Sequence, residues 1–134
     1  TQATSPGVRG FHFQEGVELF FSSGADSVIS VVPVPHSFNP HWQFVSGKEG
    51  KLSLFTNAAV KNVTPRRQDL PATFIRNSAM YIFRPSLLCA EQASFYGNDV
   101  RGYVMAARYD MDIDTFEDWE RAEGAFRKLQ KHGA

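Results

Sequence analysis

The apolar residues of this chain recur with two spacings, one typical of helices and one typical of strands. Over residues 11–21 they are three or four positions apart, which predicts a helix, and Ser23-Gly24 is expected to end it with a left-handed cap. Residues 26–34 are rich in β-branched side chains, which favours a buried strand. Further strands are predicted at residues 79–83 and 102–105.

A second helix is predicted near the end of the chain. Thr115 can cap it, with Asp118 in the position of a capping-box acid. Apolar residues then follow at three- and four-residue steps, and we expect one buried stripe. The stripe consists of Phe116, Trp119, Ala122, Phe126 and Leu129. Just before the helix, residues 111–114 are expected to be extended, which would place Asp112 and Asp114 on one side and Ile113 in the core.

The order of these elements predicts an α/β fold. Helices and strands alternate, so we expect residues 1–134 to form a single domain, a layered Rossmann-like mixed or parallel sheet flanked by helices. Residues 35–66 differ, with several prolines, a Gly-Lys-Glu-Gly turn and scattered aromatics, and we interpret them as an inserted β-rich arm with a short strand at 51–55. Exposed aromatics on an arm favour a homodimer contact, although the arm could instead fold back over its own core.

The composition limits which binding partners and which cellular compartment we expect for this protein. The 14 basic and 14 acidic residues cancel, so no broad positive field exists to attract nucleic acid or an anionic membrane. Cys89 is the only cysteine, which fits a reducing compartment, and its apolar neighbours predict a buried thiol. No apolar run reaches membrane-spanning length and no secretory signal opens the sequence, so a cytoplasmic location is expected.

The most suggestive chemistry lies in Asp112 and Asp114. Two carboxylates sharing a small volume tolerate each other when a cation lies between them, and an oxygen-only pair suits Mg²⁺ or Mn²⁺ with waters or phosphates as further ligands. The alternative is a pair of solvated acids at a strand end. The histidines show no metal-ligand spacing and are assigned no site. They are His12, His36, His41 and His132.

Five short runs, in one order along the chain, together carry more information than any single motif. They are Gln2-Ala3-Thr4-Ser5-Pro6, residues 23–31, Arg67-Gln68-Asp69-Leu70-Pro71, residues 77–82 (Asn-Ser-Ala-Met-Tyr-Ile), and residues 112–115 with Glu117-Asp118-Trp119 and Ala122-Glu123. In this order they resemble the later part of the acylneuraminate cytidylyltransferases, which make CMP-sialic acid and related CMP-activated sugar acids. The resemblance covers almost the whole chain.

The resemblance implies transfer of CMP from CTP to a sugar acid with release of pyrophosphate. It identifies Asp112 and Asp114 as metal-binding, and Arg67 as a catalytic candidate whose planar fork could bind a carboxylate or phosphate. The positions implied to surround the sugar acid or nucleotide are Gln2, Gln68, Asn77, Tyr81, Phe95 and Tyr96, the last two as an aromatic wall. The arm resembles the dimerisation excursion of the family.

The chain also departs from the family pattern. The family opens with a strand and a glycine- and lysine-rich loop (A-R-x-G-S-K) that cradles the triphosphate, and no such loop occurs before Thr1. The expectation is therefore a truncated enzyme, inactive without a separate N-terminal nucleotide-binding half. Ala3 replaces a proline and Ser78 a glycine. Two other classes remain open: a non-catalytic sugar-acid-binding or dimerisation module, and a Mn²⁺-dependent nucleotide-sugar glycosyltransferase.

Overall fold

The computed structural model describes residues 1–89 and 91–131 and divides into two compact units. Unit 1 consists of Thr1–Val32 and Arg76–Ala134, and unit 2 of Pro33–Ile75. The predicted arm at residues 35–66 lies within unit 2. The prediction of a mixed α/β protein is confirmed, because two α-helices accompany a sheet that contains both parallel and antiparallel pairs.

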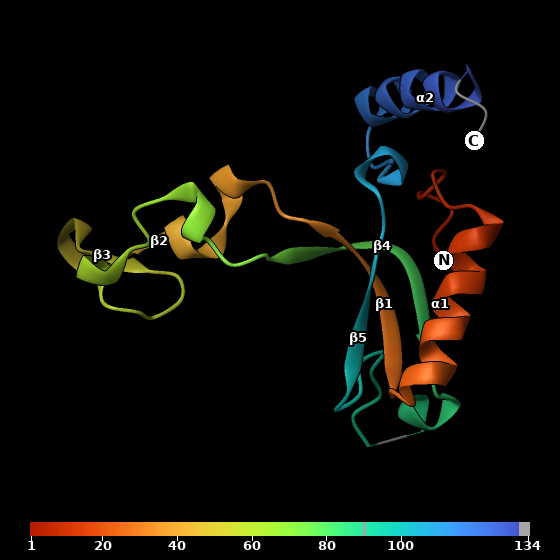
Figure 1. The fold of residues 1–134 in the computed structure, drawn as a ribbon, viewed down its shortest axis with the longest axis horizontal. Coiled ribbons are helices and arrows are strands. Elements are labelled where there is room, and N and C mark those ends of the chain that lie inside the picture. The colour runs from red at the N-terminus through yellow and green to blue at the C-terminus, as the bar shows by residue number, and fades with distance from the viewer. Residues whose placement is uncertain (90, 132–134) are drawn as a thin grey trace. The chain divides into compact units, whose positions relative to one another are not determined.

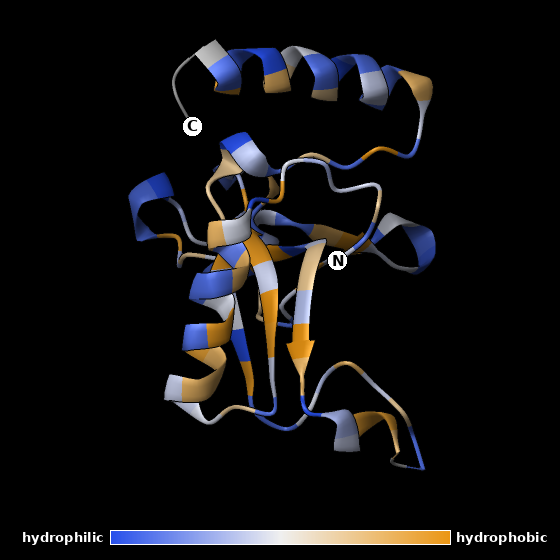
Figure 2. Ribbon diagram, turned by 90° about the vertical axis from the view of Figure 1, so that its right-hand side faces the viewer, coloured by the Kyte–Doolittle hydropathy of each residue, from blue (hydrophilic) through white to orange (hydrophobic). Residues whose placement is uncertain are grey.

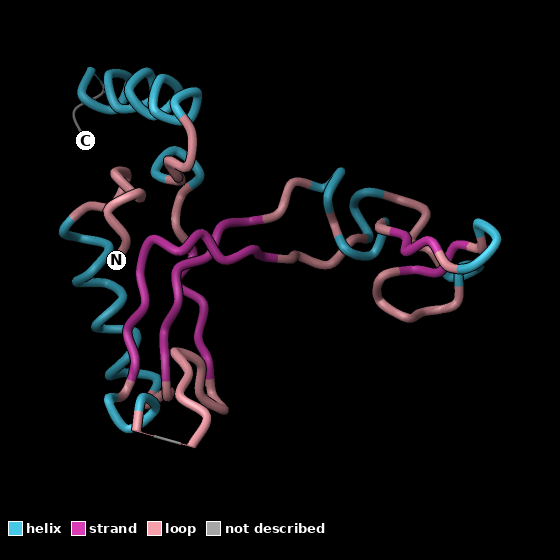
Figure 3. The backbone as a smooth tube through the Cα atoms, turned by 180° about the vertical axis from the view of Figure 1, so that it is seen from behind, coloured by secondary structure: helices cyan, strands magenta, loops and turns pink. Residues whose placement is uncertain are grey.

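A three-stranded sheet forms the centre of unit 1, in the order β4-β1-β5 (Figure 1). The strands are β1 (Ser27–Pro33), β4 (Phe74–Phe83) and β5 (Val100–Val104), and Figure 3 shows them side by side. β1 and β5 are parallel, with Ser27 opposite Val100. β4 runs antiparallel to β1, because the amide of Arg84 donates to the carbonyl of Asp26 at 3.0 Å while that of Met80 donates to Ser30 Oγ at 2.8 Å.

The first helix, α1 (Gly10–Ser23), packs closely on β4. The closeness depends on Gly16, since a Cβ built there would lie 2.5 Å from Met80 Cε. The predicted left-handed cap is confirmed at Gly24, where φ is 67°. The predicted buried strand is also confirmed, because all but two of the residues of β1 are buried.

The second helix, α2 (Phe116–Lys131), begins at the predicted capping box. The Thr115 amide donates to Asp118 Oδ2 at 2.8 Å, and the Asp118 amide donates to Thr115 Oγ1 at 3.2 Å. The predicted buried stripe is wrong at its start, because Phe116 and Trp119 are 77% and 57% exposed. Figure 2 shows hydrophobic and hydrophilic residues interspersed along α2.

The core of unit 1 explains this correction. Ala122 and Leu129 of α2 join a buried cluster with Tyr109, Met111 and others, and Phe126 packs against that cluster. The cluster contains no residue from the first turn of α2, so the aromatic side chains there stay in contact with solvent. The hydrophobic spacing gives the face of the helix but not how far along its length that face is covered.

Two further local predictions are corrected. Residues 111–114 belong to no strand; they follow a short 3₁₀ turn at Ala107–Tyr109 that comes after the end of β5. Cys89 is exposed rather than buried, because the chain after β4 forms only the short 3₁₀ helix Pro85–Leu88 and offers the thiol no covering element. Within residues 1–89 and 91–131, no helix combines the length and apolar character needed to cross a membrane.

Unit 2 contains an antiparallel hairpin and several 3₁₀ turns. The hairpin joins β2 (Phe44–Ser46) to β3 (Leu52–Leu54), which confirms the strand predicted at 51–55. The 3₁₀ turns are His36–Phe38, Pro40–Trp42, Lys48–Gly50, Val60–Asn62 and Arg67–Asp69. Buried Asn39 ties the two ends of unit 2 together, because its Nδ2 donates to the Pro71 carbonyl at 3.0 Å and to Thr73 Oγ1 at 3.2 Å.

Candidate functional site

The N-terminal turn and the acidic segment lie against each other in unit 1. The amide of Ile113, between the two candidate metal ligands, donates to the carbonyl of Thr4 at 3.0 Å. Gly7, three residues after Thr4, lies so close to Tyr109, four residues before Ile113, that an added Cβ would be 2.0 Å from the Tyr109 carbonyl oxygen. Two motifs from opposite ends of the sequence are therefore neighbours.

An acidic hollow of about 390 Å³ opens beside this contact. Its polar lining comes from Asp110, Asp112, Asp118 and Arg121. Asp112 therefore faces a space large enough for a small ligand or a hydrated ion. Asp114 is exposed but does not line the hollow.

Asp118 is already occupied by interactions within its own helix. Its carboxylate accepts hydrogen bonds from Thr115 and forms an ion pair with Arg121. The Thr115 hydroxyl and Arg121 lower the pKa of Asp118 to about 2. In the part of the chain that the structure describes, Asp112 and Asp114 form no ion pair, so these two carboxylates are the better candidates for an exogenous cation.

Carboxylate oxygens suit a hard divalent cation, but this donor set is small. Nowhere in residues 1–89 and 91–131 do three or more His, Cys, Asp or Glu side chains lie in positions to hold a metal ion together. A Mg²⁺ or Mn²⁺ ion bound through Asp112 and Asp114 would need water or substrate oxygens as its other ligands, which is common for Mg²⁺.

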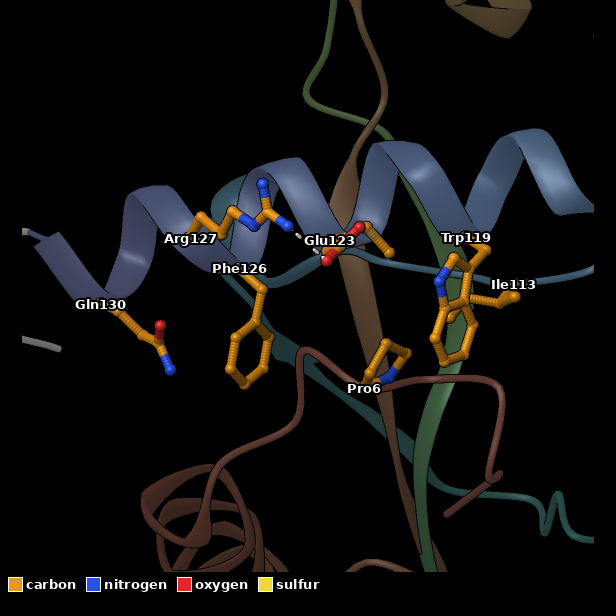
Figure 4. Close-up of a pocket in the computed structure, with 8 residues that line it drawn as sticks. Pro6, Ile113, Trp119, Glu123, Phe126, Arg127 and Gln130 are labelled. Carbon is orange, nitrogen blue, oxygen red and sulfur yellow. Dashed lines mark hydrogen bonds and ion pairs between the residues drawn. The ribbon is translucent and has the colours of Figure 1, made fainter.

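A second, mostly apolar hollow of about 330 Å³ lies under α2 (Figure 4). Ile113 lines this hollow, whereas its neighbour Asp112 lines the acidic one, so successive side chains of the segment reach different spaces. Figure 4 shows Trp119 and Phe126 projecting from α2 toward Pro6, with Glu123 paired to Arg127. Of these two hollows, only the acidic one is lined by Asp112.

The aromatic side chains predicted to line a ligand-binding site lie together elsewhere in unit 1. The ring of Tyr81, on β4, lies 5.7 Å from that of Phe95, which in turn lies 5.2 Å from Phe83. Phe95 and Tyr96 are both exposed. The loop after β4 thus brings a phenol and exposed aromatic faces together, an arrangement suited to the apolar and hydroxyl groups of a sugar.

The hydroxyl of Ser78 organises the polar edge of this aromatic cluster. Arg76 Nη1 donates to Ser78 Oγ at 3.0 Å and to Tyr81 Oη at 3.2 Å, and the Tyr81 hydroxyl donates to Ser78 Oγ at 3.3 Å. Burial raises the pKa of Tyr81, but its hydrogen bonds with Ser78 and Arg76 outweigh this effect, so the pKa lies below its ordinary value. The hydrogen bond that Arg76 donates to the Tyr81 hydroxyl raises the pKa of Arg76.

Comparison with known proteins identifies relatives along most of the chain. The chain is 37% identical to N-acylneuraminate cytidylyltransferase A of Danio rerio and 33% identical to N-acylneuraminate cytidylyltransferase of Oncorhynchus mykiss, over 91% of its length in both cases. It is 30% identical to N-acylneuraminate cytidylyltransferase of Streptococcus agalactiae over 88%. By sequence, the chain belongs to the N-acylneuraminate cytidylyltransferase family.

This membership confirms the family resemblance inferred from the five runs. The chain spans about 27% of the length of each of these cytidylyltransferases, so it corresponds to one segment of them. A scan against models of known protein families finds no match.

The structure places the candidate residues of the cytidylyltransferase motifs in three groups. Gln2, Asp112 and Asp114 lie around the contact between the N-terminal turn and the acidic segment. Tyr81, Phe95 and Tyr96 lie at the aromatic cluster. Arg67 and Gln68 are exposed on the 3₁₀ turn Arg67–Asp69 of unit 2.

Asn77 lies beside the aromatic cluster but is turned toward the core. Its Nδ2 contacts Met105 Sδ at 3.3 Å, and its Oδ1 accepts from the Ala79 amide at 3.4 Å. Both contacts support the distorted backbone around Ser78. In this arrangement the amide of Asn77 supports the strand that carries Tyr81.

Sequence reasoning missed the roles of Arg76, Ser78 and His12. The substitution of serine for the family glycine at position 78 was the available signal for the first two. His12 is 2% exposed, its Nδ1 accepts from the Arg9 amide at 2.9 Å, and burial lowers its pKa. Its ring packs 4.8 Å from that of Tyr109, which is the environment of a core residue; His132 lies outside the described residues.

Proposed function

We propose that this chain supplies the sugar-acid and metal-ion side of CMP-sugar-acid synthesis, in which CMP is transferred from CTP to a sugar acid and pyrophosphate leaves. The observation that carries the proposal is the match to N-acylneuraminate cytidylyltransferases over 88% to 91% of the chain. The acidic hollow and the aromatic cluster supply the two kinds of surface that such a reaction needs.

The roles of the side chains follow from their chemistry. Asp112 and Asp114 would hold Mg²⁺ or Mn²⁺, which offsets negative charge on phosphate oxygens during transfer. Phe95 and Tyr96 present exposed aromatic faces for the acyl group of the sugar, and Tyr81 presents a hydroxyl beside them. Gln2, Gln68 and Asn77 belong to motifs that surround the ligands in the family. Arg67 is exposed and can bind two oxygens of a carboxylate or phosphate.

We further propose that the chain does not catalyse the transfer by itself. The 134 residues contain no run of the form A-R-x-G-S-K, which cradles the triphosphate in the family. The test is pyrophosphate release from CTP and N-acetylneuraminate with Mg²⁺, for the chain alone and with a separately expressed nucleotide-binding segment of a relative. We expect turnover only in the mixture, and none after addition of EDTA. A folded mixture without turnover would contradict the proposal.

Homodimerisation through unit 2 completes the proposal. Unit 2 has a hollow of about 460 Å³ whose lining includes exposed Phe38, Phe55, Phe74 and Ile75. The unit is also basic, whereas the acidic hollow of unit 1 carries three aspartates. The basic residues of unit 2 are Lys48, Lys51, Lys61, Arg66 and Arg67, against Glu49 and Asp69. Apolar surface together with opposite charge on the two units favours a second copy of this chain as the occupant.

A non-catalytic sugar-acid-binding module is the second candidate. The observation in its favour is the aromatic cluster of Tyr81 with the exposed Phe95 and Tyr96, a surface suited to binding a sugar without a metal ion. Calorimetry separates the two candidates: sugar-acid affinity that is independent of CTP and Mg²⁺ favours the module, and sugar-acid affinity that rises in their presence favours the enzyme segment.

A further inference from the structure

Ser78 adopts a backbone conformation that serine rarely takes. Its φ is 58°, in the left-handed region, although it lies in the middle of β4. A residue with a Cβ is strained in this conformation, whereas glycine is not. The strain turns the Ser78 hydroxyl toward Arg76 and Tyr81, and both use it as a hydrogen-bond acceptor. A glycine at this position would adopt the same backbone but hold neither partner.

Arg76 is held at only one end of its guanidinium. A single nitrogen, Nη1, donates both of its side-chain hydrogen bonds in the described residues, to Ser78 and to Tyr81. In the described part of the chain Arg76 forms no ion pair with a carboxylate, and its side chain is exposed. The guanidinium carries five N–H donors, so donors remain for an anion from solution. Its immediate surroundings include the ligand-facing candidates Tyr81 and Tyr96.

We propose that Arg76 binds the carboxylate of the sugar acid, with Ser78 as the residue that positions the guanidinium. The inference rests on the proposed function and names the residue of unit 1 that would bind the carboxylate of the sugar acid. The planar fork of arginine matches the two oxygens of a carboxylate, and fixing one end of it lowers the entropy cost of that contact. Phe95, beside Tyr81, then lies where the uncharged part of the sugar would rest.

The test measures binding by calorimetry for two ligands, N-acetylneuraminate and its methyl ester, which lacks the negative charge. The proteins are the wild-type chain, Arg76→Gln and the control Arg101→Gln. The control removes the same charge from another exposed arginine, one paired with Asp99. We expect Arg76→Gln to weaken binding of the acid by about tenfold or more, the scale of a hydrogen bond to a charged group. The affinity for the ester should stay unchanged.

Two further variants separate binding from folding. Arg76→Lys keeps the charge without the fork and should restore only part of the affinity. Ser78→Gly keeps Arg76 but removes the acceptor that holds it, so it should weaken binding of the acid by a smaller factor than Arg76→Gln. An alkaline absorbance titration should show a higher tyrosine pKa in Arg76→Gln, because the hydrogen bond that lowers the pKa of Tyr81 is gone.

The possible failures are distinguishable. If the wild-type chain binds the acid and Arg76→Gln binds it equally well, the inference is wrong and the proposed function stands. Equal loss of affinity for the acid and the ester would also overturn it, because Arg76 would then act structurally. If the wild-type chain binds neither sugar, both the inference and the sugar-binding part of the proposed function fail.

Discussion

The main-chain amide of Ile113 donates a hydrogen bond to the carbonyl oxygen of Thr4 at 3.0 Å. This single bond joins the N-terminal turn to the segment that carries Asp112 and Asp114. The acidic segment belongs to no strand, so no sheet ladder holds it in place. The positions of both carboxylates therefore depend on how the N-terminal turn packs, and Gly7 controls that packing through its close approach to Tyr109.

Replacing Gly7 with alanine should loosen the acidic segment. An added Cβ would lie 2.0 Å from the Tyr109 carbonyl oxygen, and backbone atoms cannot move aside cheaply. We expect Gly7→Ala to lower the free energy of unfolding by about 1–3 kcal/mol, the usual range for overpacking. Urea denaturation measures it. The control is Gly10→Ala at the start of α1, where no atom lies within 4 Å, and equal effects in both variants would disprove the packing argument.

Protonation of Asp118 should weaken α2 at acidic pH. Its pKa in the folded protein is about 2, lowered from 3.8, chiefly by the Thr115 hydroxyl and Arg121. The folded state therefore binds the proton less readily, so its stabilisation is present above about pH 4 and is lost as the pH falls toward about 2. Asp118→Asn keeps hydrogen-bonding groups at the capping position without this titration.

The measurement for Asp118 is the urea midpoint, followed by circular dichroism, at several acidic pH values. The wild-type midpoint should fall more steeply with decreasing pH than that of Asp118→Asn. Parallel curves for the two proteins would show that the Thr115 and Arg121 contacts do not stabilise the folded state. Glu120→Gln, on an exposed site of the same helix, controls for the loss of one acid.

Local signals in the sequence predicted where elements begin and end. A serine-glycine pair ended α1 at Gly24, and Thr115 with Asp118 began α2, because caps are made by residues a few positions apart. Burial was predicted less well. Trp119 and Cys89 are exposed. Burial requires a covering element from elsewhere in the fold, and the local sequence pattern does not predict where that element lies.

The candidate site was predictable only in part, for the same reason. Family motifs identified Tyr81 and Asp112, but the contact between Thr4 and Ile113 joins segments distant in the sequence, and no periodicity indicates it. The cluster around Ser78 depends on a left-handed backbone conformation, which a serine in the sequence does not predict. Only the departure from the glycine of the family pointed to this position.

Substitutions of Ser78 should separate backbone strain from hydrogen bonding. Ser78→Ala keeps the Cβ in the left-handed conformation and removes the hydroxyl, whereas Ser78→Gly removes both the strain and the hydroxyl. We therefore expect Ser78→Ala to be less stable than Ser78→Gly by about 1 kcal/mol or more. Urea unfolding of the two variants gives the difference directly. Equal stability would mean that the backbone at this position relaxes out of the left-handed region.

Metal binding should depend on both acids of the central motif. If Asp112 and Asp114 hold the ion, Asp112→Asn and Asp114→Asn should each lower Mg²⁺-dependent CMP transfer by about 100-fold in the reconstituted mixture, since a bound cation contributes several kcal/mol. Electron paramagnetic resonance of free Mn²⁺ gives a readout that does not require activity. Glu120→Gln removes a nearby exposed acid and should change neither measurement. Unaltered Mn²⁺ binding in both aspartate variants would rule out this site.

Dimerisation should depend on the aromatic surface of unit 2. Phe38 and Phe55 are 63% and 59% exposed and line the same hollow, so a second copy that covers them would bury a large apolar area. Replacing both with serine should shift the chain from dimer to monomer in sedimentation velocity, while circular dichroism stays unchanged. The control is Phe21→Ser, which removes a still more exposed aromatic, 77% exposed, from α1 in unit 1. A wild-type chain that is monomeric would contradict the proposed dimer. A dimer that persists in the double variant would exclude this surface as the interface, because a contact that buries these two rings cannot survive their removal without a measurable loss of affinity.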